Sequence, residues 1–202
     1  MGELPEGMEM PKSERAKPRP SASVILSRER EGGHEILLGH RVSELPAFPD
    51  VWSFPGGAIS RVDRAAAESN REWLQDRVDR VSVFALLREM VEELGVAPDG
   101  LGGLTEVKED VRAEVCEDKA NWLRLMDSGA LTCKGFHCEM ITERITPPQA
   151  PARFHNLFFH VPTGDPGVTP SFPPGRSEFD EFRWWRPVSY THLRAHETSL
   201  HL

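Results

Sequence analysis

The segment Arg-Glu-Met-Val-Glu-Glu-Leu-Gly-Val at residues 88–96 constrains the fold of this chain more than any other. At the α-helical rotation of about 100° per residue, Glu89, Glu92 and Glu93 fall within an arc of about 100°. The opposite side of the same helix carries the apolar side chains Leu86, Leu87, Met90, Val91 and Leu94. The spacing therefore predicts a helix that buries one face and directs three carboxylates from the other face to one place.

The same segment indicates how this helix ends and what its acidic face binds. Gly95 stands where a residue with positive φ ends a helix. Unpaired carboxylates held this close raise one another's pKa unless a cation lies between them. Carboxylate oxygens suit Mg²⁺ or Mn²⁺. An ordinary solvated acidic face is the other interpretation of this helix, and the segment alone leaves both open.

The remaining pattern predicts one α/β domain over residues 21–187, with helices packed on a mixed sheet. Apolar β-rich runs predict strands at 21–27, 35–40, 52–54, 134–145, 153–161 and 181–185. Helical composition predicts helices at 63–80, 81–95 and 105–129. Residues 1–20 are rich in proline and charge, which predicts a flexible tail. Residues 188–202 show neither period and resemble translated adapter sequence, so we expect a non-native tail there.

Charge and cysteine content exclude several classes of protein. The 202 residues carry a formal net charge of −8, which argues against nucleic acid as a partner. No apolar run approaches the roughly 18 residues of a membrane span, so no membrane partner is expected. The 3 cysteines form no CxxC motif, and Cys133, His137 and Cys138 fit no standard zinc spacing. We therefore expect reduced thiols and a cytoplasmic location.

A glycine pair upstream gives the acidic segment its context. Pro55-Gly56-Gly57 followed by the segment at 88–96 resembles the Nudix hydrolase box. That box runs Gly, five residues, Glu, seven residues, then Arg-Glu-apolar-x-Glu-Glu-x-Gly-apolar. The second half matches at every specified position, and the resemblance covers about residues 21–187. It implies a Nudix-type α/β/α sandwich with a mixed β-sheet.

The first half of the box is interrupted. Arg88 follows Gly57 by 31 residues (88 − 57) where the plain box has 14, so 17 residues are extra. We expect this helical insertion at 63–80. The position of the upstream Glu is Arg80 here, which leaves Asp63 as the first candidate for the structural carboxylate and Glu72 as the second.

The insertion resembles the subfamily typified by peroxisomal coenzyme A diphosphatase. The further matches are Leu37-Leu38 with Arg41, Phe48-Pro49, Ile145-Thr146-Pro147-Pro148, Arg153-Phe154 with Phe158-Phe159, and Trp184-Trp185-Arg186-Pro187. A coenzyme A signature of other Nudix diphosphatases is half present. Leu37, Leu38, Arg41 and Phe54 keep its spacing, whereas its second Arg falls on Pro46 and its Gly on Asp50.

The resemblance implies hydrolysis of a diphosphate bond in a small nucleoside-diphosphate-linked substrate, with coenzyme A or acyl-coenzyme A first and ADP-ribose or NADH as the rival. It assigns catalysis to Glu92, Glu93 and Arg88. Metal binding, to Mg²⁺ or Mn²⁺, falls on Glu89, Glu92, Glu93 and Gly57. A Nudix-fold binding module without catalysis is the alternative from another class, although such modules usually lose the acidic motif that is intact here.

Several other residues have two interpretations. Arg41 is a candidate phosphate clamp or a solvated strand end. Glu178 is the first candidate for a late-loop carboxylate at the substrate, followed by Asp180 and Glu181, although all three also fit ordinary loop residues. Trp52 and Trp184 suit stacking on adenine or packing in the core. A homodimer is compatible with the sequence.

Overall fold

The structure, a computed structural model, describes residues 17–74, 77, 79–150, 152–164 and 167–187. Its strands are β1 (Arg19–Arg30), β2 (Gly33–Arg41), β3 (Trp52–Ser53), β4 (Gly56–Ala58), β5 (Val96–Pro98), β6 (Leu104–Glu106), β7 (Glu139–Ile145), β8 (Phe154–Pro162) and β9 (Phe179–Trp185). Its helices are α1 (Arg61–Ser69), the 3₁₀-helix η1 (Arg71–Leu74), α2 (Arg80–Glu89), the π-helix η2 (Met90–Leu94), α3 (Glu109–Glu117) and α4 (Lys119–Asp127).

Seven of these strands form one mixed sheet. Its order is β3-β2-β1-β8-β7, with β4 paired to β1 and β9 paired to β2. The β1–β8 pair is parallel, whereas β1 pairs antiparallel with both β2 and β4. These two strands use different parts of one edge of β1, since β4 pairs at residues 21–23 and β2 at residues 27–30. The sheet therefore branches along β1.

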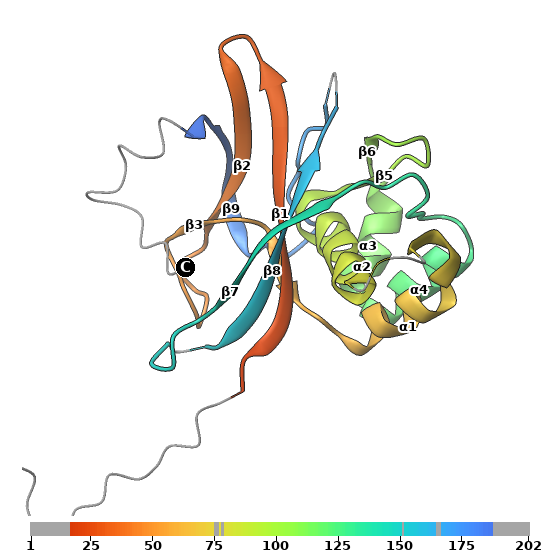
Figure 1. The fold of residues 1–202 in the computed structure, drawn as a ribbon, viewed down its shortest axis with the longest axis horizontal. Helices are drawn as coiled ribbons and strands as arrows, with labels where there is room; N and C mark the ends of the chain where they lie inside the picture. The colour runs from red at the N-terminus through yellow and green to blue at the C-terminus, as the bar shows by residue number, and fades with distance from the viewer. Residues whose placement is uncertain (1–16, 75–76, 78, 151, 165–166, 188–202) are drawn as a thin grey trace, which may run out of the picture.

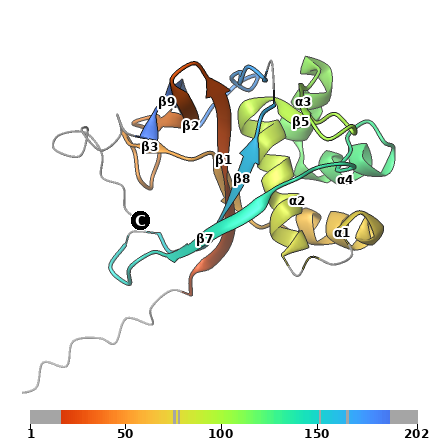
Figure 2. The same ribbon diagram turned by 45° about the horizontal axis from the view of Figure 1, so that its top comes forward.

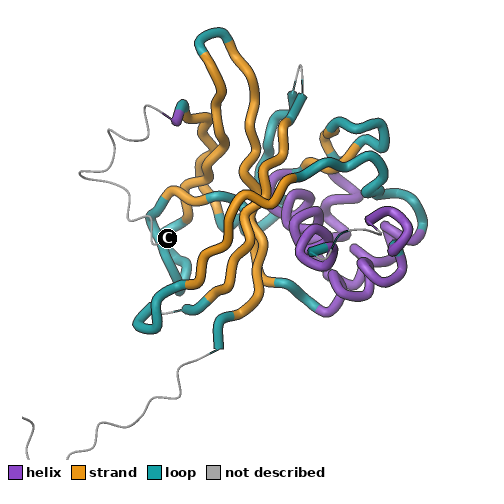
Figure 3. The backbone as a smooth tube through the Cα atoms, in the orientation of Figure 1, coloured by secondary structure: helices purple, strands orange, loops and turns teal. Residues whose placement is uncertain are grey.

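The helices cover one side of this sheet. Figures 1 and 2 show α1 to α4 gathered on the same side of β1 and β8, and Figure 3 shows the same separation of helix from strand. Alternate residues of β1 are completely buried there, and α2 packs on β1 and β4. The core joins these strand residues to the helix, and its members include Ala22, Val24, Leu26, Val83, Phe84, Leu87 and Phe159. None of the described helices is long and apolar enough to cross a membrane.

The predicted α/β fold with a mixed sheet is confirmed. Of the two helical layers in the expected sandwich, the described residues form one. The predicted strands at 21–27, 35–40 and 153–161 are present, and the first is longer at both ends. Tails were predicted at residues 1–20 and 188–202, of which 1–16 and 188–202 lie outside the described residues. The end of the first tail is wrong, because β1 already begins at Arg19.

Three predicted boundaries are wrong, two of them for local reasons. The helix expected over 63–80 ends at Ser69, because the Asn70 side chain donates to the Ala66 carbonyl and the chain leaves the helical region. The helix expected over 105–129 is two helices separated at Asp118, whose extended backbone and side chain cap α4. The strand expected from residue 134 begins at Glu139.

Candidate active site

The acidic segment forms the last turn of α2 and the π-helix η2 that continues it. Residues Val83–Leu87 and Met90–Val91 are buried against the sheet, as the apolar spacing predicted. Gly95 ends the helix with φ 68°, and its N–H reaches the carbonyls of Met90 and Val91. The predicted glycine terminus is therefore confirmed. The π-helical turn was not predicted, and it changes the angles between Glu89, Glu92 and Glu93 because its turns are wider than α-helical ones.

Arg88 is the centre of this segment. Its side chain is completely buried. Nε donates to Asp63 Oδ1 at 2.8 Å and Nη2 to Asp63 Oδ2 at 3.1 Å. Nη1 lies 2.8 Å from Glu89 Oε1 and 2.9 Å from Glu92 Oε2, and Nη2 also donates to the Ala58 carbonyl. Arg88 therefore ties the end of α2 to α1 and fixes the positions of two site carboxylates.

This geometry decides between the two candidates for the structural carboxylate. Asp63 is completely buried and receives the Arg88 guanidinium in a bidentate pair. It also accepts from the Ser60 N–H at 2.7 Å and thereby starts α1. Glu72 is exposed in η1. Asp63, the first candidate from the sequence, is the carboxylate that meets Arg88.

The glycine pair allows the strand to approach the acidic helix. A Cβ atom at Gly57 would lie 2.3 Å from Glu89 Oε1, and one at Gly56 would lie 2.2 Å from the Ala22 carbonyl. Gly56 also has φ 149°, and its N–H donates to Glu93 Oε2 at 2.6 Å. Only glycine fits at these two positions without displacing a carboxylate or strand β1.

Burial changes the acidity of the two most enclosed carboxylates. Desolvation raises the pKa of Glu89 to about 7; Arg88 opposes this shift and Glu92 adds to it. Desolvation, followed by the charges of Glu89 and Glu178, also raises the pKa of Glu93 well above its ordinary value. Burial works against the charge of Arg88, yet Glu89, Asp63 and Glu92 outweigh it and raise the pKa of that guanidinium.

The three carboxylates face protein donors rather than one shared point. Arg88 Nη1 holds Glu89 and Glu92, and the Gly56 N–H holds Glu93. Within the described ranges, no three Asp, Glu, His or Cys side chains are arranged to hold a metal ion. One carboxylate oxygen, Glu92 Oε1, is nevertheless buried without a hydrogen-bond partner. An orphaned anionic oxygen of this kind fits a divalent cation.

A cleft of about 680 Å³ opens beside these residues. Glu89, Glu92 and the glycine pair form one end of it. Its walls include the apolar side chains Leu45, Phe48, Val51, Trp52, Phe54 and Phe158. A cleft of this size with mixed walls suits a nucleotide-sized molecule.

The structure brings Arg41 and Glu178 together at the rim of the cleft. Arg41 Nη1 donates to Glu178 Oε2 at 3.2 Å, while Nε and Nη2 donate to the carbonyls of Phe48 and Ala47. Arg41 therefore braces the loop before β3. That loop is strained, because Phe48 and Asp50 both have φ 53°, a region that residues with a Cβ seldom adopt.

Some of the other candidates from the sequence reach the cleft and others do not. Asp180 binds His40 Nδ1 at 2.8 Å, and Glu181 pairs with Arg183, so both face away from the carboxylate cluster. Trp52 lines the cleft, whereas Trp184 packs on the core and lies under Arg28. Glu178 and Trp52 are the members of these sets that reach the cleft.

Two basic residues of the site were not found from the sequence. Arg112 in α3 is buried, and its Nη2 donates to the Glu92 carbonyl at 3.0 Å and to the Ser171 carbonyl at 2.9 Å. It thereby supports the end of η2. Lys119, the first residue of α4, lines the cleft and lowers the pKa of Glu89. Neither lies in a motif, so only their positions in the fold reveal them.

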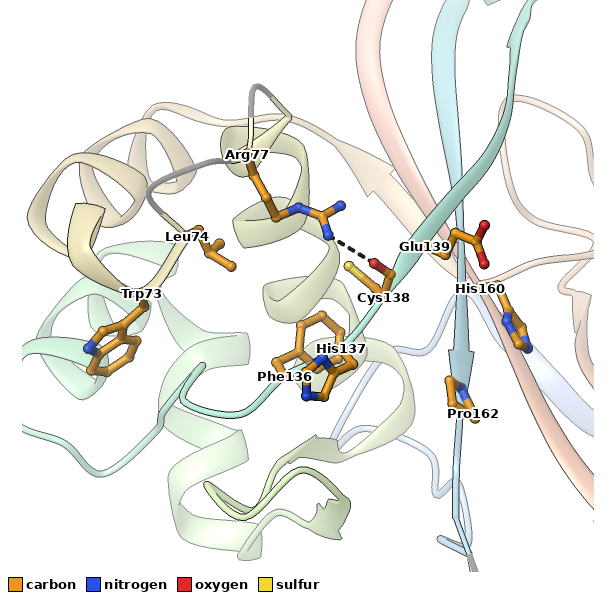
Figure 4. A pocket seen from close by; sticks show the side chains of 9 residues that line it. All are labelled: Trp73, Leu74, Arg77, Phe136, His137, Cys138, Glu139, His160 and Pro162. Carbon is orange, nitrogen blue, oxygen red and sulfur yellow. Dashed lines mark hydrogen bonds between the residues drawn. The ribbon is translucent and has the colours of Figure 1, made fainter.

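A second cavity, of about 530 Å³, lies between η1 and the strands β7 and β8 (Figure 4). It contains His137 and Cys138. Its guanidinium, Arg77, is already held by Asp79 at 2.7 Å and by the Cys138 carbonyl. Desolvation raises the pKa of Cys138 to about 11, which keeps this thiol protonated. None of the residues that line this cavity also lines the cleft beside the carboxylate cluster.

Comparisons with known proteins agree with this architecture. No family model matches the sequence, and no curated protein sequence does. A Nudix hydrolase from Alicyclobacillus acidocaldarius superposes with a TM-score of 0.74 at 23% identity, over 89% of this chain and 84% of that one. The Nudix domain of Shewanella oneidensis NrtR, solved with ADP ribose, matches at 0.48 and 14%, over 91% and 82% of the chains.

A MutT Nudix hydrolase from Burkholderia pseudomallei matches at a TM-score of 0.45 and 14% identity, over 84% of this chain and 83% of that one. The two matches below 0.5 add nothing to the first. On the superposition with the Alicyclobacillus acidocaldarius protein, this chain has the fold of the Nudix hydrolases.

Proposed function

We propose that this protein hydrolyses the diphosphate bond of a small nucleoside-diphosphate-linked substrate with the help of Mg²⁺ or Mn²⁺. The observation that carries the proposal is the buried Arg88 network, which places Glu89 and Glu92 at one end of a nucleotide-sized cleft beside Gly56 and Gly57. The Nudix fold of the chain supports a hydrolase.

The donors at this end of the cleft fit a divalent cation. Glu89, Glu92 and Glu93 would hold it, with the Gly57 carbonyl as a further ligand. Glu92 Oε1 lacks a partner, and burial makes the charges of Glu89 and Glu93 unfavourable without a counter-ion. When bound, such a cation neutralises phosphate oxygens and lowers the pKa of a bound water.

The protein's own residues then have separate tasks. Arg88 is too buried to touch a substrate, so its contribution to catalysis is to hold Glu89 and Glu92. Burial raises the pKa of Glu93 well above its ordinary value, which makes this carboxylate a stronger base than an exposed glutamate. Glu178, at the rim of the cleft, is close enough for its charge to act on Glu93. Arg41 is placed to grip a phosphate at this rim once Arg41 releases Glu178.

Coenzyme A or acyl-coenzyme A is the substrate that we propose first. This choice rests on the resemblance carried by Leu37, Leu38, Arg41 and Phe54, of which Arg41 and Phe54 line the cleft. ADP-ribose or NADH is the alternative within the same reaction class. A binding module without turnover is the alternative outside it. The cytoplasmic location and the homodimer stay predictions.

The test is a product analysis with coenzyme A, acetyl-coenzyme A, ADP-ribose and NADH in Mg²⁺ and in Mn²⁺. Release of 3′,5′-ADP and 4′-phosphopantetheine is expected for the first substrate. Glu92→Gln should lower kcat/KM by about 10²–10³-fold, because it weakens cation binding. Glu106→Gln on the exposed β6 strand is the control. Full activity of Glu92→Gln would refute the assignment, and binding without any hydrolysis would favour the binding module.

A further inference from the structure

The end of the cleft away from the three carboxylates carries two arginines. Arg19 begins β1 and Arg144 lies in β7, and both line the cleft. They flank β8, because Arg19 pairs with Phe154 and Arg144 with Asn156. Phe154 and Asn156 are two residues apart and therefore face the same side of the sheet. Figures 1 and 2 both show the start of β1 beside the β7–β8 hairpin.

Neither arginine is neutralised by a neighbour. Arg144 Nη1 donates to Thr142 Oγ1 at 2.6 Å and to the Glu143 carbonyl at 2.8 Å, which orients the guanidinium along the strand. Arg19 lies 6.0 Å from the centroid of the Phe154 ring. Among the described residues, no carboxylate pairs with either side chain. Two uncompensated guanidinium groups on one face suit an anion, and phosphate matches their paired donors.

The floor between the arginines and the glycine pair is uncharged, and it includes polar side chains beside the ring of Phe158. Ser21 and Asn156 are neighbours across β1 and β8, and both line the cleft. Asn156 Nδ2 donates to Ser23 Oγ at 2.9 Å, while its Oδ1 has no partner. This strip offers hydrogen-bonding groups to a sugar or a base and does not repel phosphate.

The spacing along β1 relates the arginines to the proposed reaction site. Ala22 pairs with Gly57, and Arg19 precedes Ala22 by three residues. At the strand rise, these three residues span about 10 Å. One nucleotide therefore reaches from a diphosphate at the glycine pair to a second phosphate at Arg19.

We propose that Arg19 and Arg144 form an anion subsite for a second phosphate group of the substrate, separate from the diphosphate that is cleaved. This inference rests on the proposed function, because it places the cleaved diphosphate beside Gly57. It narrows the substrate class to nucleoside diphosphates that carry a further phosphate on the nucleoside. Arg19 and Arg144 are then specificity residues and have no part in bond cleavage.

Binding of two ligands that contain no diphosphate bond tests the subsite without hydrolysis. Adenosine 3′,5′-bisphosphate and adenosine 5′-monophosphate are titrated into the full chain by calorimetry, in Mg²⁺ at constant ionic strength. The parent protein should prefer the bisphosphate by about tenfold or more, which is the size of one charge-assisted contact. Arg19→Gln/Arg144→Gln should reduce this preference to about threefold or less and leave the affinity for the monophosphate unchanged.

Arg64→Gln is the matched control, because Arg64 is exposed on α1. Its replacement removes one positive charge, as does each replacement at Arg19 or Arg144. It should keep the preference of the parent. Three outcomes would overturn the subsite. The parent could bind the bisphosphate and the monophosphate with equal affinity, it could fail to bind the bisphosphate, or the double variant could keep the preference of the parent. If a thermal scan shows that the double variant is not folded at the assay temperature, the single variants replace it. Each of them must then lower the preference for the bisphosphate. An intact preference without hydrolysis of any diphosphate would instead refute the proposed function.

Discussion

Two arginine–carboxylate pairs hold this cleft, and they differ in burial. Arg88 and Asp63 are both completely buried, with contacts of 2.8 and 3.1 Å. Arg41 and Glu178 lie at the rim, 3.2 Å apart, with 18% and 54% of their side chains exposed. The inner pair joins α1 to α2, whereas the outer pair braces a strained loop against β9.

The difference in burial separates structural from functional roles. A buried guanidinium that loses one partner leaves charges without solvent, so the inner pair must be kept intact for the chain to fold. An exposed pair gains little from its charges, because water screens them. The outer pair can therefore open for a substrate at low energetic cost. The inner pair can only position the carboxylates beside it.

Removal of the inner guanidinium should have the largest effect on stability. Arg88→Met leaves Asp63, Glu89 and Glu92 buried without their common cation. We expect a loss of about 3–5 kcal/mol in the free energy of unfolding, measured by urea denaturation. Arg64→Met on the exposed face of α1 is the control. A loss below about 1 kcal/mol would mean that the inner pair is no more structural than the outer one.

Replacement of the inner carboxylate should have a smaller effect. Asp63→Asn keeps a hydrogen bond to Arg88 but removes the charge, while Glu89 and Glu92 still neutralise the guanidinium. We expect a loss of about 2 kcal/mol, whereas Glu72→Gln should change stability by less than about 0.5 kcal/mol. Equal losses in the two variants would contradict the assignment of Asp63.

Addition of metal should stabilise the folded protein through the carboxylates beside the inner pair. If Mg²⁺ binds the folded chain with a Kd of about 1 mM, 10 mM Mg²⁺ should raise the free energy of unfolding by about 1.4 kcal/mol. Thermal scans with Mg²⁺ and with a chelator measure this difference. Glu92→Gln should abolish it, and Glu106→Gln should retain it. Equal stabilisation of both variants would place the cation elsewhere.

Substitution at the outer pair should change stability least. Arg41→Lys keeps the charge but loses the planar group that holds the Phe48 and Ala47 carbonyls. We expect less than about 1 kcal/mol of lost stability, together with a fall of about tenfold in kcat/KM. Arg30→Lys at the exposed end of β1 is the control. A loss of stability as large as that of Arg88→Met would remove the distinction between the two pairs.

Much of the acidic helix was predictable because its information is local. The apolar repeat from Leu86 to Leu94 determined the buried face, and Gly95 determined the end of the helix. The resemblance to the Nudix box also reduced the structural carboxylate to two candidates. The strand alternation placed β1, β2 and β8. These features depend on residues a few positions apart, which the 3.6 and 2.0 periods describe.

Other parts of the site depend on contacts between distant segments. Arg112 and Lys119 lie 16 and 23 residues beyond the end of the acidic segment at Val96, and no motif marks them. The positive φ values at Phe48 and Asp50 also have no motif, and they lie in the loop whose Phe48 carbonyl accepts a hydrogen bond from Arg41. The π-helical turn was also missed, because its sequence is compatible with a regular α-helix.

The sequence by itself determined that three carboxylates and an arginine share one helix end, since periodicity and turn chemistry are local. The resemblance to the Nudix box implied that a glycine pair lies beside them. Only the tertiary structure decided which upstream carboxylate pairs with Arg88 and which late-loop acid reaches the cleft. It also decided which arginines of the cleft have no carboxylate partner among the described residues. Burial and ion pairing are properties of the packed chain. They depend on which strands and helices meet, and that arrangement is set by the whole core at once.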